Sequence, residues 1–286
     1  MSSVPSVPDD LANDVQKGRC SVFVGAGLSV GAGYPTWDQL LHTLIGLAEN
    51  KKLIDSKKKS ELNKMRKLPN KWLMIAQELM DAYTEGPFQA ELSAVFDAIS
   101  ASPTDAHKAI TEINFSFVIT TNYDQLIENA YFPKFGRIPK IFTHYDKEDF
   151  ADSLWKGDFF ILKAHGSLDR KSTVILTEKD YRRLIYSSPG YRAILGAIFT
   201  TKTILFLGAS LSDPELNLLL GSLHDNFQGK GQTHFALIAN DGFSETEADH
   251  WRKNYNVRCL LYTPSSGHPE LLAFLKELGR LSAPRP

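Results

Sequence analysis

The chain has 286 residues, of which 43% are hydrophobic and 23% are charged, as in an ordinary globular protein. Its 32 lysines and arginines balance 33 acidic residues, so the chain as a whole has no electrostatic attraction to nucleic acid or to an anionic membrane. Two cysteines, Cys20 and Cys259, are too few for a disulfide framework or a four-cysteine zinc site. We find neither a signal peptide nor the roughly 18 apolar residues of a membrane helix, and therefore expect a cytoplasmic protein.

Six short apolar runs have the length of strands, and segments with helical signals separate them. The runs are nearly continuous in Val, Ile, Leu and Phe, which is typical of strands covered on both faces in a parallel sheet. Alternation of such strands with helices predicts an α/β fold with a doubly wound parallel sheet. The six runs cover residues 21–24, 117–120, 159–162, 203–207, 234–239 and 257–262.

Two helix starts are recognisable between these runs. Thr36 stands three residues before Gln39, which is the spacing of a capping box. Asp213 precedes Pro214, and this pair is typical of an N-cap followed by the first helical position.

The stretch between the first two strands is too long for one crossover helix. Residues 51–113 carry several helical segments, so we predict a helical insertion there within a single domain over 1–286. The ends, 1–10 and 282–286, are expected to be loose tails. Positive charge gathers over residues 51–67, either as a solvated helix face or as a docking surface for an acidic partner or nucleic acid.

The loop after the first strand is rich in glycine and reads Gly25-Ala26-Gly27-Leu28-Ser29. Glycine lets the backbone turn sharply and approach a phosphate closely, so such a loop is a nucleotide-binding signal. It is not a P-loop, because no Gly-Lys-Ser/Thr follows, and Val30 stands where the dehydrogenase fingerprint needs glycine. A tight turn without a ligand is the alternative.

Three further polar loops follow predicted strands. They contain Asn122 and Asp124, His165, and Gly208 with Ser210. Carboxyl ends of strands are the place where open α/β sheets bind ligands. Each loop also has a structural interpretation, because Asn122 or Asp124 could cap a helix, His165 could be a core histidine, and Ser210 could be a turn residue.

In this order, the segments GAGLSVGAGYPTW, TTNYD, KAHGSLD and LFLGASLSDPELNLLL resemble the sirtuin-like (SIR2-like) domains of bacterial anti-phage defence proteins. The resemblance runs from about Gly18 to Leu278 and implies a Rossmann-like fold that binds NAD as substrate, without a metal. By resemblance, Asn122 and His165 are the catalytic residues, with His165 as general base. The cofactor-binding residues it implies are Gly25, Ala26, Gly27 and Ser29 at the pyrophosphate, Asp124 at the nicotinamide ribose, and Gly208 and Ser210 at the adenosine half.

The sequence departs from protein-deacylating sirtuins in two ways. It has no CxxC pair for their zinc ribbon, and the helical insertion occupies that place. Pro35-Thr36-Trp37-Asp38 replaces their Pro-Asp-Phe-Arg sequence. We therefore expect water as the acceptor and NAD hydrolysis as the reaction. Cyclisation, a protein deacylase or ADP-ribosyl transferase, and a nucleotide-sensing or assembly module without turnover remain alternatives.

Hydrolysis of NAD needs control in a living cell. The expected single domain leaves no room for a regulatory domain, so we expect a homo-oligomer or a separate regulatory protein. By resemblance, such a partner is a hexameric ATPase or an Argonaute-like protein.

Overall fold

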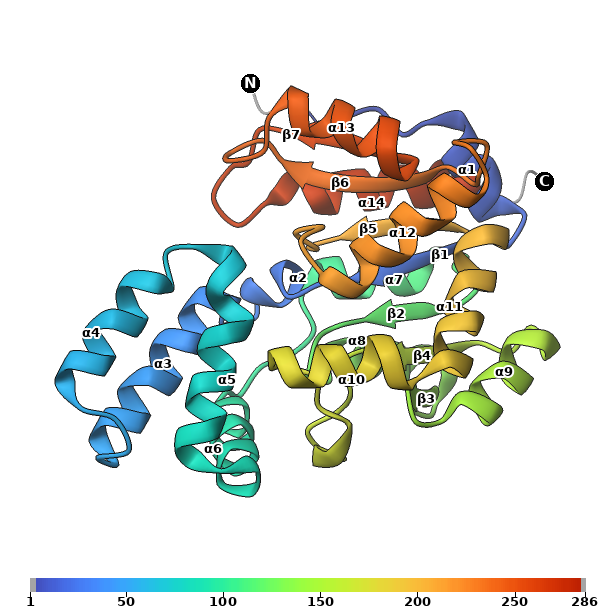
Figure 1. Cartoon of the computed structure of the whole chain (residues 1–286). Helices are drawn as coiled ribbons and strands as arrows, with labels where there is room; N and C mark the ends of the chain where they lie inside the picture. The colour runs from blue at the N-terminus through green and yellow to red at the C-terminus, as the bar shows by residue number, and fades with distance from the viewer. Residues whose placement is uncertain (1–3, 284–286) are drawn as a thin grey trace.

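The computed structural model describes residues 4–283 and is built around one seven-stranded sheet whose neighbouring strands are all parallel (Figure 1). The strand order is β3-β4-β2-β1-β5-β6-β7. The chain therefore runs from the central β1 toward one edge, returns to the other side of β1 as β5, and continues to the second edge. This is the predicted doubly wound α/β fold. The strands are β1 (Cys20–Val24), β2 (Val118–Thr120), β3 (Lys140–Thr143), β4 (Phe160–Lys163), β5 (Thr203–Leu207), β6 (His234–Ala239) and β7 (Val257–Tyr262).

The six predicted strands are present. The last three have the predicted bounds, and the first three differ by one residue at one or both ends. The sequence does not predict β3, which forms an edge of the sheet and pairs only with β4 among the described strands. Lys140 and Ile141 of β3 are exposed, so this strand lacks the continuous apolar run of a strand buried on both faces.

Helices cover both faces of the sheet because successive strand residues point to opposite sides. In β1, Val22 and Val24 join one core, and Phe23 joins the other. The first face is covered by α1 (Asp9–Gln16), α7 (Asp105–Glu112), α8 (Leu126–Phe135) and α14 (Pro269–Ser282). The second is covered by α9 (Lys147–Lys156), α10 (Glu178–Ser187), α11 (Pro189–Thr201), α12 (Pro214–Asn226) and α13 (Glu245–Tyr255).

The helical insertion is present beside the sheet (Figure 1), but its bounds differ from the predicted 51–113. It consists of α3 (Trp37–Asn50), α4 (Ser56–Met65), the short 3-10 helix η1 (Pro69–Lys71), α5 (Trp72–Tyr83) and α6 (Glu85–Asp97). α3 belongs to it because Leu41 and Leu44 pack with α5 in a third core. α7 does not, because Ile110 packs under the sheet.

The predicted helix starts are confirmed. Thr36 and Gln39 form a reciprocal capping box at α3. Asp213 caps α12, and Pro214 is the first helical residue.

The tails are shorter than predicted within the described residues. Pro8 is buried and α1 begins at Asp9, so residues 9 and 10 are helical. At the other end α14 continues to Ser282, which is buried. Residues 1–3 and 284–286 of the predicted tails lie outside the described residues.

Several cations of the charged run 51–67 pair with acidic residues of the insertion itself. Lys58 binds Glu78 of α5 at 2.6 Å, and Lys59 binds Glu49 of α3 at 2.5 Å. Part of the positive charge of residues 51–67 is therefore used in ion pairs between helices of the insertion. Among the described helices, none combines the length and the hydropathy that crossing a membrane requires.

A buried histidine at the start of β6 predicts how stability depends on pH. His234 accepts a hydrogen bond from the Ile204 N–H at 3.2 Å, and burial lowers the pKa of its imidazole to about 3 despite a bond to the Phe199 carbonyl. Below pH 6.5 the unfolded chain binds a proton here that the folded chain does not bind, so stability falls as pH decreases toward 3. At pH 5.5 this histidine should cost the folded state about 1.4 kcal/mol relative to pH 7.5.

Denaturant unfolding of wild type and His234→Asn at these two pH values measures the effect. The asparagine can still accept from Ile204 but does not titrate. The free energy of unfolding of wild type should therefore fall by about 1.4 kcal/mol more than that of the variant. Equal decreases would show that His234 is protonated in the folded state.

Candidate active site

The four polar loops leave the sheet at the same level. Val24 of β1 is the register partner of both Thr120 and Leu207, and Thr120 is in turn the partner of Lys163. The residue after each of these strand ends therefore begins a loop, and all four loops leave the sheet at the carboxyl ends of its strands. Asn122 and His165 both lie two residues beyond a register pair, Thr120 and Lys163, so adjacent strands present them side by side.

The first and fourth loops meet where the chain changes direction across the sheet, between β1 and β5. Gly25 N–H donates to the Leu207 carbonyl and Gly27 N–H to the Gly208 carbonyl, both at 2.9 Å. A Cβ on Gly25 or Gly27 would lie 2.6 Å or 2.8 Å from the Gly208 carbonyl oxygen. These glycines are therefore required for the close contact of the two loops.

This contact leaves one of the first three loop N–H groups without a partner. In the part of the chain that the structure describes, the N–H of Ala26 donates no hydrogen bond, whereas those of Gly25 and Gly27 do. The chain then forms the four-residue helix α2 (Gly27–Val30), which buries Ser29. Of the N–H groups predicted to hold a pyrophosphate, that of Ala26 is the one left to donate to an anion.

Asn122 is buried, and its two side-chain polar atoms differ in their partners. Its amide Nδ2 donates to the Gly25 carbonyl at 3.2 Å and to the Ser29 hydroxyl at 3.0 Å. Its Oδ1 is buried and has no hydrogen-bond partner among the described residues. A buried acceptor without a partner is costly, so Asn122 offers an oriented oxygen that a hydroxyl group or a water molecule can satisfy.

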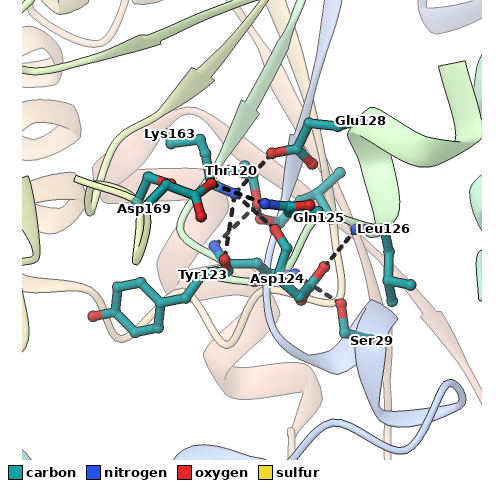
Figure 2. A network of polar contacts seen from close by, with 12 residues as sticks. Ser29, Thr120, Tyr123, Asp124, Gln125, Leu126, Glu128, Lys163 and Asp169 are labelled. Atoms are coloured by element: carbon teal, nitrogen blue, oxygen red, sulfur yellow. Dashed lines mark hydrogen bonds and ion pairs between the residues drawn. The ribbon is translucent and has the colours of Figure 1, made fainter. Parts of the chain in front are cut away.

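Asp124 and Tyr123 fix the rest of the second loop. The Asp124 carboxylate accepts from the N–H of Leu126, the first residue of α8, at 3.0 Å (Figure 2). The N-cap position of α8 is occupied by Gln125, without a side-chain cap hydrogen bond, so Asp124 closes the turn before the helix and is not its cap. The Tyr123 hydroxyl donates to the Ile175 carbonyl at 2.5 Å, and its ring meets Phe96 of α6 edge-on. The helical insertion thus packs directly against this loop.

His165 lies buried on the third loop and contacts two residues that sequence reasoning did not select for the site. Its Nε2 is 3.1 Å from Asp213 Oδ2 and 3.2 Å from the Tyr181 hydroxyl. Tyr181 also donates to Asp213 Oδ2 at 2.7 Å, while Asp213 Oδ1 accepts from the Leu216 N–H at 2.9 Å. Nε2–H therefore donates to the carboxylate, and Nδ1 is the ring nitrogen that can accept a proton.

Burial raises the pKa of both acids beside His165, but the net shifts are opposite. Burial raises the pKa of Asp213, but the neighbouring His165 and the donors from Leu216 and Tyr181 outweigh it, so this pKa lies below its usual range. Glu215 has a buried Oε1 without a partner among the described residues. Burial and the nearby Asp213 charge raise its pKa to about 8, although Arg192 opposes the shift. At neutral pH the pair therefore carries mainly one negative charge.

A small cavity of about 20 Å³ adjoins these groups, with His165, Asp213 and Glu215 in its wall. That is room for about one water molecule. The same three residues each offer one possible metal-ligand atom, and these atoms lie within 4.8 Å of one another. His165 Nε2 and Asp213 Oδ2 already contact each other at 3.1 Å. The expected absence of a metal stays a prediction.

The structure thus brings most predicted site residues together, with one exception. Ser210 is exposed, and its hydroxyl binds that of Ser212 at 2.6 Å. Asp213 was recognisable only as a helix cap. Lys163 had one signal, a charge that ends an otherwise apolar strand, whereas nothing in the sequence singles out Tyr181 or Glu215.

A family model for the SIR2-like domain matches residues 116–260, about half of the chain. The chain belongs to the SIR2-like domain family. It is 27% identical to the NAD(+) hydrolase ThsA of Bacillus cereus (strain MSX-D12), over 87% of this chain and 49% of that protein. It is 28% identical to the NAD(+) hydrolase ThsA of Enterococcus faecium, over 85% of this chain and 49% of that protein.

Defense-associated sirtuin 2 of Bacillus subtilis is 28% identical over 74% of this chain and 20% of its own length. Among solved structures, a Sir2 homologue in complex with NAD aligns with 98% of this SIR2-like chain and 96% of its own, at 14% identity and a TM-score of 0.46. The chain spans about half the length of the ThsA relatives. The predicted membership of a SIR2-like family with defence relatives is confirmed.

The turn after His165 predicts a large effect of one methyl group. Gly166 has a φ of +82°, and a Cβ there would clash with the carbonyl oxygen of Thr173. Gly157 has a similar φ of +71° and nothing within 4 Å of an added Cβ. Each alanine variant should lose about 1–2 kcal/mol from the left-handed backbone, and Gly166→Ala about 1–3 kcal/mol more from the clash.

Denaturant unfolding of Gly166→Ala and Gly157→Ala gives the comparison directly, because the second variant isolates the backbone effect. Similar losses in the two variants would contradict the tight packing of the His165 turn against Thr173.

Proposed function

We propose that this SIR2-like chain is an NAD hydrolase that cleaves the nicotinamide–ribose bond and releases nicotinamide and ADP-ribose. The observation that carries the proposal is that Asn122 and His165 lie side by side. Each is two residues beyond a position at which β2 and β4 pair in register. One offers a buried acceptor without a partner, and the other is an imidazole bound to a carboxylate. The relatives named NAD(+) hydrolase ThsA support the same reaction.

The reaction needs an electron-rich pocket and a proton acceptor. As the nicotinamide leaves with the electron pair of the glycosidic bond, the ribose gains oxocarbenium character. Asn122 Oδ1 accepts a hydrogen bond from a ribose hydroxyl or from the attacking water and so orients it. Water then forms the new bond to the ribose carbon, and His165 takes up its proton and passes it to solvent.

Asp213 supports His165 in this reaction. Its carboxylate holds the imidazole by Nε2 at 3.1 Å, so that Nδ1 can take the proton. The negative charge of Asp213 stabilises the imidazolium that forms. Tyr181 donates to the same carboxylate oxygen and remains protonated, because burial and the Asp213 charge raise the pKa of its hydroxyl well above 10.

The first and fourth loops would hold the remainder of NAD. Gly25, Ala26, Gly27 and Ser29 are proposed to lie along the pyrophosphate, with the free Ala26 N–H as donor to a phosphate oxygen. Asp124 is proposed at the nicotinamide ribose, and Gly208 and Ser210 at the adenosine half. In this proposal no metal takes part.

The biological role extends the same proposal. We infer that the hydrolase depletes NAD in anti-phage defence. The relatives named NAD(+) hydrolase ThsA support NAD as the substrate, and the name Defense-associated sirtuin 2 supports a role in defence. Control by homo-oligomerisation or by a separate regulatory protein, such as a hexameric ATPase or an Argonaute-like protein, is part of it.

The first experiment measures nicotinamide release from NAD by purified protein. Wild type should release nicotinamide and ADP-ribose, and Asn122→Ala and His165→Ala should each lower kcat/KM by about 10²–10⁴-fold, because each removes a group that acts on the reacting atoms. Asn114→Ala and His250→Ala are matched controls away from the site and should keep the wild-type rate. Undiminished release by both site variants, with intact folding, would refute the assignment.

A second experiment addresses Asp213. The variant Asp213→Asn retains a residue that caps helices well but loses the negative charge beside His165. We expect a decrease in kcat of about tenfold to a hundredfold. An unchanged kcat would show that Asp213 only caps α12.

A further inference from the structure

A lysine ammonium lies buried beneath the two loops that carry Asn122 and His165. Lys163 is the last residue of β4 and has no exposed surface, and its Nζ forms an ion pair with Glu128 of α8 at 2.7 Å. Removing two charges from water is costly, and a buried ion pair rarely stabilises a fold more than an apolar pair of the same volume. Stability alone is therefore a weak reason for this pair.

The ammonium also binds the backbone that places Asn122 and Asp124. Nζ donates to the Asp124 carbonyl at 2.7 Å and to the Tyr123 carbonyl at 3.4 Å (Figure 2). With Glu128, these acceptors match the three N–H donors of a lysine. Because both carbonyls are held, the peptide units that follow Asn122 keep their orientation, and so does the side chain that contacts Ser29.

The same lysine belongs to the loop of His165. Its carbonyl accepts from the Gly166 N–H at 3.0 Å, which closes the turn that presents the imidazole. The Gln125 side-chain amide donates to the Asp169 carboxylate at 2.8 Å and forms a second link between the same two segments (Figure 2). Both the side chain and the backbone of Lys163 thus contribute to the spacing between the second and third loops.

We propose that Lys163 is a positioning residue that sets the separation of Asn122 and His165 for NAD cleavage. This inference rests on the proposed function, because it assigns Lys163 a role through those two residues. Lys163 itself touches neither the substrate nor the reacting atoms. Glu128 holds the ammonium in place.

The test replaces the ion pair as a unit. Lys163→Met alone leaves the Glu128 carboxylate buried without a partner and is expected to unfold at lower temperature. The double variant Lys163→Met/Glu128→Leu removes both charges at similar volume, so it should fold like wild type while the carbonyls of Tyr123 and Asp124 lose their donor. We expect its kcat to fall about tenfold to a hundredfold, because small displacements of reacting groups have effects of this size.

Two comparisons separate positioning from a merely structural role. The control Lys140→Ala/Asp158→Ala removes the 2.7 Å ion pair of the β3 edge and should leave kcat unchanged. In an Asn122→Ala background the pair replacement should lower the remaining rate by less than twofold, since residues that act together are not additive. A folded double variant with wild-type kcat, or equal losses in both backgrounds, would overturn the proposal.

Inactivity of the isolated wild type would count against the proposed function or reflect its control, and it would not bear on this inference. Hydrogen–deuterium exchange over residues 121–126 then decides the positioning role without NAD. Faster exchange there in the double variant, with unchanged exchange in β1 and β5, supports the role of Lys163. Unchanged exchange over 121–126 overturns it.

Discussion

Parallel pairing of the central strands is the constraint on which the rest of the molecule depends. The last residues of four strands, β1, β2, β4 and β5, are aligned across the sheet: Val24, Thr120, Lys163 and Leu207. Four loops that are far apart in the sequence therefore begin together at the carboxyl ends of these strands. Short loops then suffice to bring their side chains into contact. Asn122 reaches the first loop through Ser29, and His165 reaches the fourth through Asp213.

The glycines of the first loop show how this alignment acts on the backbone. Loops that leave β1 and β5 at one level need to pass each other closely, and Gly25 and Gly27 lie against Gly208 without room for a Cβ. The N–H groups of both residues are occupied in that contact. The glycine-rich pattern therefore serves loop packing as well as any ligand, and the N–H of Ala26 has no partner among residues 4–283.

Burial raises the pKa of both acids in the site, and the hydrogen-bond donors around each acid decide whether it stays charged. Asp213 and Glu215 are two residues apart, yet Asp213 receives bonds from His165, Tyr181 and Leu216 and keeps its pKa low. Glu215 lacks such donors among the described residues, and its pKa rises to about 8. On the other side of the site, the three acceptors around Lys163 hold a fully buried ammonium. Each loop is thereby held by a different set of polar contacts.

The sequence by itself determined the alternation of strands and helices, the capping of α3 and α12, and the four loops at the strand ends. These features are local, since each depends on apolar runs, a cap or a glycine within a few residues. The edge strand β3 escaped prediction because an edge strand needs no continuous apolar run. The bounds of the insertion were predicted wrongly because they depend on packing. α3 packs with the other helices of the insertion, whereas α7 packs against the sheet.

Only the tertiary structure decided which polar groups meet. The sequence indicated Asp213 only as a helix cap, a role that one of its carboxylate oxygens fulfils. The other oxygen contacts His165, 48 residues earlier in the chain. Tyr181 joins them from α10, and Lys163 reaches the carbonyls of a loop about 40 residues before it. Such contacts follow from strand register and helix packing, which bring distant residues together and leave no local pattern in the sequence.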